Sequence, residues 1–173
     1  MDVVDDNPAS PELESREPTL EDLVELCRNL NAQQARYIVV GGFAIRAAGY
    51  VRRTMDVDLL IETGEANERR VFKALESLPD QAVKELQPGE VAQYVVVRVA
   101  DEIVVDLMRA ACGIEYLEAS KDVVTHEVQG VRIPFASPRL LWRMKATTYR
   151  DKDLPDLHFL RLLLERRGES VPE

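Results

Sequence analysis

YIVVGGFAIRAAGYVRRTMDVDLLIE, residues 37–62, is the stretch that decides how this chain folds. An apolar run breaks at two glycines, a short helical pattern follows, and Asp56-Val57-Asp58 leads into a second apolar run. The simplest interpretation is strand, glycine turn, helix and strand. Because side chains alternate along a strand, we expect Asp56 and Asp58 to project from the same face. Neighbouring carboxylates repel each other, and a divalent cation such as Mg²⁺ is their usual counter-charge.

The residues between the two strands have the properties of a phosphate-binding turn. Gly41 and Gly42 have no Cβ, so a ligand can approach the backbone, and a helix that begins near Phe43 presents free N–H groups. The same segment supplies three cations, Arg46, Arg52 and Arg53. Taken alone, Asp-x-Asp is more simply explained as two solvated acids at the start of a strand. The glycines, the arginines and the spacing favour a binding site.

The whole run resembles the signature of the DNA polymerase β-like nucleotidyltransferases, in which a hydrophobic residue and Gly-Gly or Gly-Ser precede Asp-x-Asp by about ten residues. The fuller form, GGFAIRAAGYVRRTMDVDLLI, is similar to the branch that includes the AbiEii-type toxins and related small nucleotidyltransferases. The resemblance implies transfer of a nucleoside monophosphate from a nucleoside triphosphate to an acceptor hydroxyl. It also implies two Mg²⁺ ions as cofactors.

Length and composition fit one domain. The 173 residues are enough to bury a core. Cys27 and Cys112 are far apart and form no metal-binding pattern, so we expect two free thiols and no zinc site. No stretch approaches the length of a membrane span, and the acidic N-terminus is unlike a signal peptide. We therefore expect a cytoplasmic protein that does not engage membranes.

The charge distribution limits the class of partner. A net charge of −9 argues against a general nucleic-acid coat, which needs a basic face. Residues 1–18 contribute −5 of this charge, which leaves −4 for the rest of the chain and room for a local positive site. We interpret residues 1–18 as a disordered acidic tail, residues 19–168 as the nucleotidyltransferase domain and residues 169–173 as a second tail.

The other patterns predict an α/β domain with a mixed β-sheet flanked by helices and further helices at the C-terminus. Strand-like runs lie at 91–99, 102–108 and 123–135, the last of them turned at Gln129-Gly130. Helical patterns lie at 20–30, with Thr19 as the N-cap, at 65–78 and at 113–119.

A third acid, Asp106, interrupts the apolar run at 102–108. If this strand lies beside the Asp56 strand, at the ~4.8 Å spacing of neighbouring strands, its carboxylate joins the other two. The resemblance implies the same role, because the family uses a third acid on a later strand. The alternative is that Asp106 faces solvent on an edge strand. His126 alternates with apolar neighbours, and we expect it to be structural rather than catalytic.

A second informative segment is SPRLLWRMKATTYRDKDLPDL, residues 137–157. Ser137 and Pro138 begin a helix, and another helix begins near Leu154-Pro155. The string K-x-x-x-x-R-x-K-D-x-x-D-L resembles a downstream motif of the AbiEii-type branch, which places a lysine and an aspartate near the nucleotide. Matching residue by residue gives Lys145, Arg150, Lys152, Asp153 and Asp156. Alone, such a string is more often a charged corner between two helices.

These motifs define a candidate site. The predicted metal ligands are Asp56, Asp58 and Asp106, and the predicted catalytic residues are these three with Lys145. The predicted nucleotide contacts are Gly41, Gly42, Arg46, Arg53, Thr54, Lys145, Arg150, Lys152, Asp153 and Asp156. The expected reaction is an in-line displacement at the α-phosphorus, and Asp106 is the best candidate to help deprotonate the acceptor hydroxyl.

Three functions remain open from the sequence. The first is an active nucleotidyltransferase that modifies RNA or protein as a toxin or effector, with an antitoxin protein as its partner. The second is the same chemistry on a small hydroxylated molecule, as in the aminoglycoside and lincosamide modifiers. The third is a nucleotide- or partner-binding module without turnover. The intact Asp-x-Asp motif and Asp106 disfavour the third function.

Overall fold

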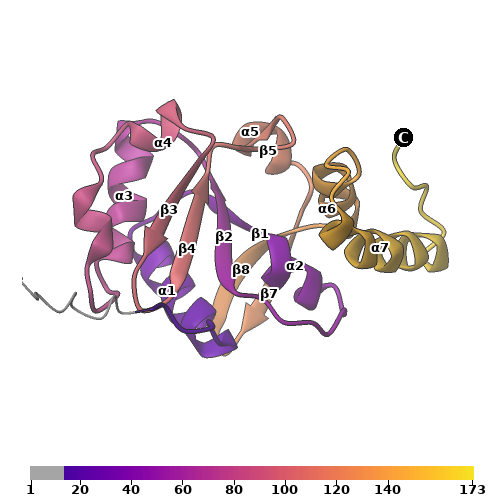
Figure 1. The fold of residues 1–173 in the computed structure, drawn as a ribbon, viewed down its shortest axis with the longest axis horizontal. Coiled ribbons are helices and arrows are strands. Elements are labelled where there is room, and N and C mark those ends of the chain that lie inside the picture. Colours follow the sequence, from indigo (N-terminus) through magenta and orange to yellow (C-terminus); the bar gives the residue numbers. More distant parts are fainter. Residues whose placement is uncertain (1–13) are drawn as a thin grey trace, which may run out of the picture.

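A six-stranded mixed sheet organises the computed structural model, which describes residues 14–173 (Figure 1). The strand order is β3-β4-β2-β1-β8-β7. The strands are β1 (Tyr37–Val40), β2 (Asp56–Ile61), β3 (Val96–Ala100), β4 (Val104–Met108), β7 (Val123–Val128) and β8 (Val131–Ala136). Strand β2 pairs in parallel with β4, and β1 with β8, whereas the other neighbours are antiparallel. The predicted α/β class with a mixed sheet is confirmed.

Helices flank this sheet (Figure 1). Helix α1 (Leu20–Ala32) packs against α3 (Glu65–Leu75) and β8, and α2 (Gly41–Ala47) packs on β1 and β2. At the C-terminal end α6 (Pro138–Lys145) and α7 (Leu154–Arg166) pack against each other, as predicted. The short elements are η1 (Ala82–Glu85), α4 (Glu90–Gln93), β5 (Ala110–Ala111), β6 (Ile114–Glu115), α5 (Tyr116–Ala119) and η2 (Asp151–Asp153). Within residues 14–173, no helix combines the length and apolar character needed to cross a membrane.

The helix starts follow their local sequence. Thr19 caps α1 by accepting a hydrogen bond from the backbone N–H of Asp22, and the Asp22 carboxylate accepts one from the N–H of Thr19 in return. The Ser137 hydroxyl caps α6 by accepting a hydrogen bond from the backbone N–H of Leu140, with Pro138 in the first turn. Both starts agree with the sequence prediction. Helix α2 begins at Gly41 instead of near Phe43, so both glycines belong to its first turn.

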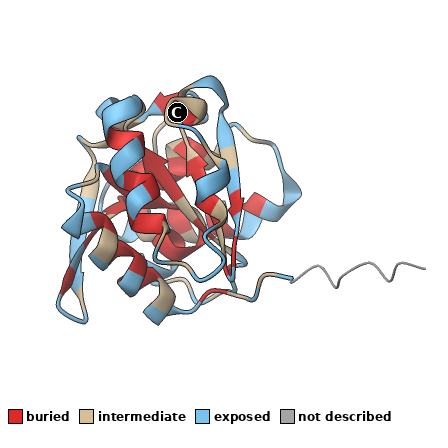
Figure 2. Cartoon of the chain, turned by 90° about the vertical axis from the view of Figure 1, so that its left-hand side faces the viewer, coloured by how far each residue is buried: buried red, intermediate tan, exposed pale blue. Residues whose placement is uncertain are grey.

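The core lies at the centre of the sheet. In β2, Val57 and Leu59 to Ile61 are buried, whereas Asp56 and Asp58 are only partly buried. Figure 2 shows buried residues along the strands and on the inner sides of the helices, with exposed residues on the outer helix faces. The alternation predicted from the sequence therefore holds for the part of β2 that carries the two aspartates.

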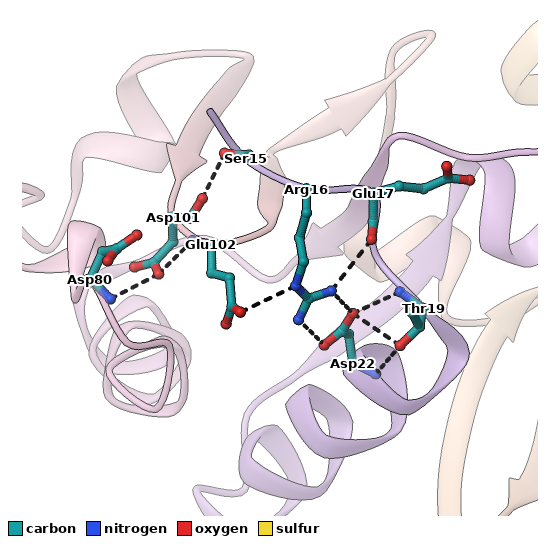
Figure 3. A network of polar contacts seen from close by, with 8 residues as sticks. All are labelled: Ser15, Arg16, Glu17, Thr19, Asp22, Asp80, Asp101 and Glu102. Atoms are coloured by element: carbon teal, nitrogen blue, oxygen red, sulfur yellow. Dashed lines mark hydrogen bonds and ion pairs between the residues drawn. The ribbon is translucent and has the colours of Figure 1, made fainter. Parts of the chain in front are cut away.

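The segment before α1 contacts the domain in an ordered way (Figure 3). The Arg16 guanidinium pairs with both carboxylate oxygens of Asp22, at 2.6 and 2.8 Å, and its Nε donates to Glu102 at 3.2 Å. The Ser15 hydroxyl donates to the carbonyl oxygen of Asp101 at 2.6 Å. The end of the expected tail is thus held on the domain: Ser15 and Arg16 contact α1 and the β3–β4 turn, and Glu17 pairs with Arg53 in the loop before β2. Residues 1–13 lie outside the described part.

Residues 91–95 differ from the predicted strand. Glu90–Gln93 forms the short helix α4, and strand β3 begins only at Val96. The cause lies in α3, where the buried Glu68 carboxylate accepts hydrogen bonds from the N–H groups of Gly89 and Val91. These bonds hold the turn, and Val91 packs into the core. Local β-propensity is overridden by a contact from a distant helix.

Candidate active site

Three aspartates from two neighbouring parallel strands form the centre of the candidate site. Asp58 on β2 lies directly opposite Asp106 on β4, and Asp56 is two residues before Asp58 on the same face. One carboxylate oxygen of each residue lies within 4.8 Å of the others. Asp106 does not face solvent on an edge strand, because β3 covers the far side of β4. The predicted meeting of these three carboxylates is confirmed.

The electrostatics of the cluster suit a divalent cation. Burial, followed by the charges of Asp56 and Asp106, raises the pKa of Asp58 to about 7. Burial and the proximity of Asp106 also raise the pKa of Asp56. Lys145 and Arg98 oppose the shift at Asp58 but do not cancel it. Carboxylate oxygens are the donors that Mg²⁺ and Mn²⁺ prefer, so this donor set fits such an ion.

The two glycines allow α2 to begin directly against β2. Gly41 has φ +65°, and a Cβ there would lie 2.0 Å from Oδ2 of Asp58. A Cβ at Gly42 would lie 2.4 Å from Oγ1 of Thr54. Thr54 is buried, and its hydroxyl donates to the carbonyl oxygen of Asp56 at 3.0 Å. The glycines therefore place the first turn of α2 beside the carboxylate cluster, in addition to leaving room for a ligand.

A second cluster of charges joins α6 to α7. The Lys145 ammonium lies 2.9 Å from Asp153 and 3.4 Å from Asp156, and both aspartates are buried. Arg150 and the Thr148 hydroxyl also donate to Asp153, at 2.8 and 2.7 Å. Burial alone would raise the pKa of Asp153, but the hydrogen bonds from Lys145 and Thr148 outweigh it and lower the pKa to about 2.

Arg52 ties this second cluster to the loop before β2. Its Nε lies 2.9 Å from Oδ1 of Asp156, and its Nη2 donates to Oδ2 at 3.0 Å. Asp156 therefore contacts one cation from α6 and one from the loop that leads to Asp56. Lys145 also lies close enough to Asp58 to oppose the rise of its pKa. The two clusters form one connected site.

Both clusters line a cavity of about 800 Å³. Its wall includes most of the predicted site: Gly41, Gly42, Arg53, Thr54, Asp56, Asp58, Asp106, Lys145, Arg150, Lys152, Asp153 and Asp156. Apolar side chains of Val96, Met108, Leu141 and Met144 complete it. A volume of this size is in the range that holds a small-molecule ligand or nucleotide.

Two predicted nucleotide contacts have other neighbours. The Arg46 guanidinium lies over the Phe43 ring, 5.3 Å from its centroid, and lines a separate cavity of about 390 Å³ on the other side of α2. The structure therefore does not bring Arg46 to the carboxylates, because position 46 is on the outer face of α2. Arg53 lines the main cavity but pairs with Glu17 at 2.6 Å, and its side chain is largely exposed.

Arg98, like Arg52, is a site residue that the predicted set of contacts omits. It lies on β3 directly opposite Asp106 and donates to both oxygens of that carboxylate, at 2.9 and 3.0 Å. Its Nη2 also donates to Asp56 at 3.1 Å. A signal was present, because a hairpin that turns at 101–103 pairs position 98 with position 106. The strands expected at 91–99 and 102–108 have other limits than β3 and β4, so the expected hairpin did not pair these two positions.

Comparisons with known proteins give the fold a context. No protein-family model and no curated protein matches this chain. Among solved structures, it is similar to an antigenic nucleotidyltransferase-like protein from Paracoccidioides brasiliensis, with a TM-score of 0.51, 16% identity, and coverage of 83% of this chain and 74% of that chain. It is also similar to a candidate nucleotidyltransferase from Thermotoga maritima, with a TM-score of 0.50, 17% identity, and coverage of 86% and 93%. The chain has a nucleotidyltransferase-like fold. At identities of 16% and 17% the similarity shows a shared fold alone. The chemistry of this nucleotidyltransferase-like domain must therefore be argued from its own side chains.

Proposed function

We propose that this protein is a metal-dependent nucleotidyltransferase that transfers a nucleoside monophosphate from a nucleoside triphosphate to an acceptor hydroxyl. The observation that carries the proposal is the meeting of Asp56, Asp58 and Asp106 on one wall of the 800 Å³ cavity. A nucleotide-binding module without turnover has no need of three mutually repelling carboxylates at this place. The raised pKa values of Asp56 and Asp58 indicate that these two carboxylates destabilise the fold when they are charged.

The three aspartates would hold one or two divalent ions, Mg²⁺ being the ion we propose. When bound, such ions neutralise charge on the phosphate oxygens and orient the reacting groups. In the transfer step, the acceptor oxygen forms a bond to the α-phosphorus while the bond from this phosphorus to the pyrophosphate oxygen breaks. We assign to Asp106, whose side chain lines the cavity, the role of accepting the proton of the acceptor hydroxyl.

The remaining residues of the chain would bind the triphosphate. Arg53, Arg150 and Lys152 line the cavity as cations, and the first turn of α2 begins beside Asp58. Lys145 would contribute positive charge next to Asp58, held in place by Asp153 and Asp156. Thr54 supports the strand start at Asp56 through its hydroxyl. Arg46 is left out of this assignment, because it lines the other cavity.

The acceptor class has two candidates. We favour RNA or protein, in a toxin or effector role with an antitoxin as partner, as the resemblance to the AbiEii-type branch implies. Supporting this, the chain around the cavity exposes large apolar side chains at Val51, Met55 and Tyr149, which suit contact with a macromolecule. A small hydroxylated molecule is the alternative, because the cavity has room for one beside a nucleotide.

A labelling experiment tests both the reaction and the acceptor. The protein is incubated with Mg²⁺ and each of the four α-³²P-labelled nucleoside triphosphates, together with RNA, protein or low-molecular-weight cell extract. We expect label in one of these fractions and release of pyrophosphate. Asp58→Ala should abolish both signals, whereas Asp80→Ala, which changes an exposed aspartate outside the cavity, should not. Absence of transfer from every nucleotide to every fraction would overturn the enzymatic proposal.

A further inference from the structure

The Arg98 guanidinium binds two of the three carboxylates that would hold a metal ion. Its guanidinium donates to Oδ1 and Oδ2 of Asp106 and to Oδ2 of Asp56, at 2.9, 3.0 and 3.1 Å. Both oxygens of Asp106 are thus engaged by one cation. This is the forked geometry that an arginine makes with a carboxylate, and it is stronger than a single hydrogen bond.

The oxygens used by Arg98 overlap with those that a metal ion needs. Asp56 and Asp106 are two of the three candidate ligands, and their closest oxygens lie within 4.8 Å of each other and of Asp58. A bidentate guanidinium leaves fewer free lone pairs on the two Asp106 oxygens for a divalent ion, and its positive charge repels that ion. Binding of the ion and this position of Arg98 are therefore in competition.

The two partners of this contact differ in mobility. The Asp106 side chain is 7% exposed and fixed within the sheet, whereas the Arg98 side chain is 59% exposed on the edge strand β3. The guanidinium can therefore move without opening the core. Because Arg98 lines the main cavity, a displaced guanidinium stays at the wall of the space that we assign to the triphosphate.

We propose that Arg98 is a positioning residue that alternates between the carboxylates of Asp56 and Asp106 and the phosphate groups of the nucleotide. This inference rests on the proposed function. With Arg98 on the carboxylates, metal alone binds weakly. The triphosphate offers the guanidinium a second anionic partner, so metal and nucleotide bind together more favourably than either does alone. Arg98 would thus couple the two ligands.

The test measures metal binding directly. Mn²⁺ alone is titrated into the wild type and into Arg98→Met, which keeps the apolar stem but removes the fork, with free Mn²⁺ followed by electron paramagnetic resonance. We expect the variant to bind Mn²⁺ at least about tenfold more tightly, since close charge pairs carry at least this coupling. In saturating Mn²⁺, non-hydrolysable α,β-methylene triphosphates should bind the variant at least about tenfold more weakly.

Two further variants separate this role from a structural one. Arg98→Lys keeps the charge without the fork, so both affinities should lie between those of the wild type and Arg98→Met. Arg36→Met is the matched control, because Arg36 is also 59% exposed and pairs with one carboxylate, Glu62, at the other end of β1. It should change neither affinity. A purely structural arginine would not move the two affinities in opposite directions.

The outcomes distinguish this inference from the proposed function. Mn²⁺ that binds Arg98→Met no more tightly than the wild type overturns the competition. Tighter Mn²⁺ binding with unchanged triphosphate binding overturns the phosphate contact and the coupling. Absence of Mn²⁺ binding to wild type, Arg98→Met and Arg98→Lys alike overturns the metal site itself and the proposed function with it.

Discussion

Gly41 and Asp58 are so close that a Cβ on the glycine would lie 2.0 Å from the Asp58 carboxylate oxygen. Gly41→Ala therefore combines the strain of a left-handed backbone with a clash that the Asp58 side chain or the first turn of α2 must relieve by moving. We expect a loss of about 2–4 kcal/mol in the free energy of unfolding, measured by urea denaturation. Gly130→Ala separates the two causes, because Gly130 has φ +78° but open space around its Cβ position. An equal loss in both variants would contradict the role of the close contact.

The stability of the protein should depend on pH through Asp58. Its pKa of about 7 in the folded state lies above its ordinary value near 3.8, so the folded state binds the extra proton between these two pKa values. The contribution of Asp58 to stability is therefore highest at low pH and falls as pH rises toward and through 7. The full shift corresponds to at most about 4 kcal/mol.

Asp58→Asn measures this contribution by removing the titrating group. In EDTA we expect the variant to exceed the wild type in stability at pH 8 by more than it does at pH 5, in urea denaturation at both pH values. Asp80→Asn, on the exposed turn after α3, is the control and should show no such pH dependence. A stability gain of Asp58→Asn that is the same at both pH values would contradict the raised pKa.

The ion pairs that Asp156 makes with two cations should contribute to the stability of the fold. Asp156 is buried and contacts both Lys145 and Arg52, so Asp156→Ala leaves two cations without their shared partner. We expect a loss of about 2–4 kcal/mol by chemical denaturation. Glu118→Ala, which breaks the exposed pair with Arg143, should cost less than about 1 kcal/mol. Similar small losses in both variants would show that the buried cluster is dispensable.

Asp106 and Lys145 should differ in which kinetic constants they affect. If Asp106 acts in the transition state, Asp106→Asn keeps triphosphate binding within a few-fold and lowers transfer by at least ~10²-fold. Lys145→Ala should weaken triphosphate binding as well, because its charge acts in the ground state and the transition state alike. Pyrophosphate release and equilibrium binding are measured side by side. An Asp106→Asn protein with wild-type transfer would remove Asp106 from the mechanism.

The strands and helix starts that depend on neighbouring residues in the sequence could be predicted from the sequence alone. The apolar runs around the glycines form β1 and β2, and the caps at Thr19 and Ser137 begin α1 and α6 as predicted. The acid within the run at 102–108 was also informative, because a charge in a buried strand requires a partner. Asp106 indeed lies in the carboxylate cluster opposite Asp58, and its charge is paired with Arg98.

The misses depend on contacts between distant segments. The helix at Glu90–Gln93 exists because Glu68, far away in the sequence, binds the backbone of that turn. Arg98 belongs to the site because the register of the β3–β4 hairpin pairs it with Asp106. An error in the predicted limits of these strands shifts that register, so the pairing was not predicted. Arg46 was grouped with Arg53 by proximity in sequence, but the rotation of α2 turns it to the other cavity. The periodicity of apolar residues predicts helices and strands. These three outcomes depended instead on how the helices and strands pack against one another.

The parallel pairing of β2 with β4 has a consequence for the order of folding. Asp58 and Asp106 are 48 positions apart in the chain, and α3, η1, α4 and β3 all lie between the strands that carry them. Closing so long a connection is slow compared with forming a hairpin or a helix. The β3–β4 hairpin joins Arg98 to Asp106 over a short loop, whereas the three-carboxylate cluster forms only when β4 docks on β2. During synthesis, a chain that has not yet passed residue 108 cannot complete this cluster, so metal affinity would report the moment at which the central sheet closes.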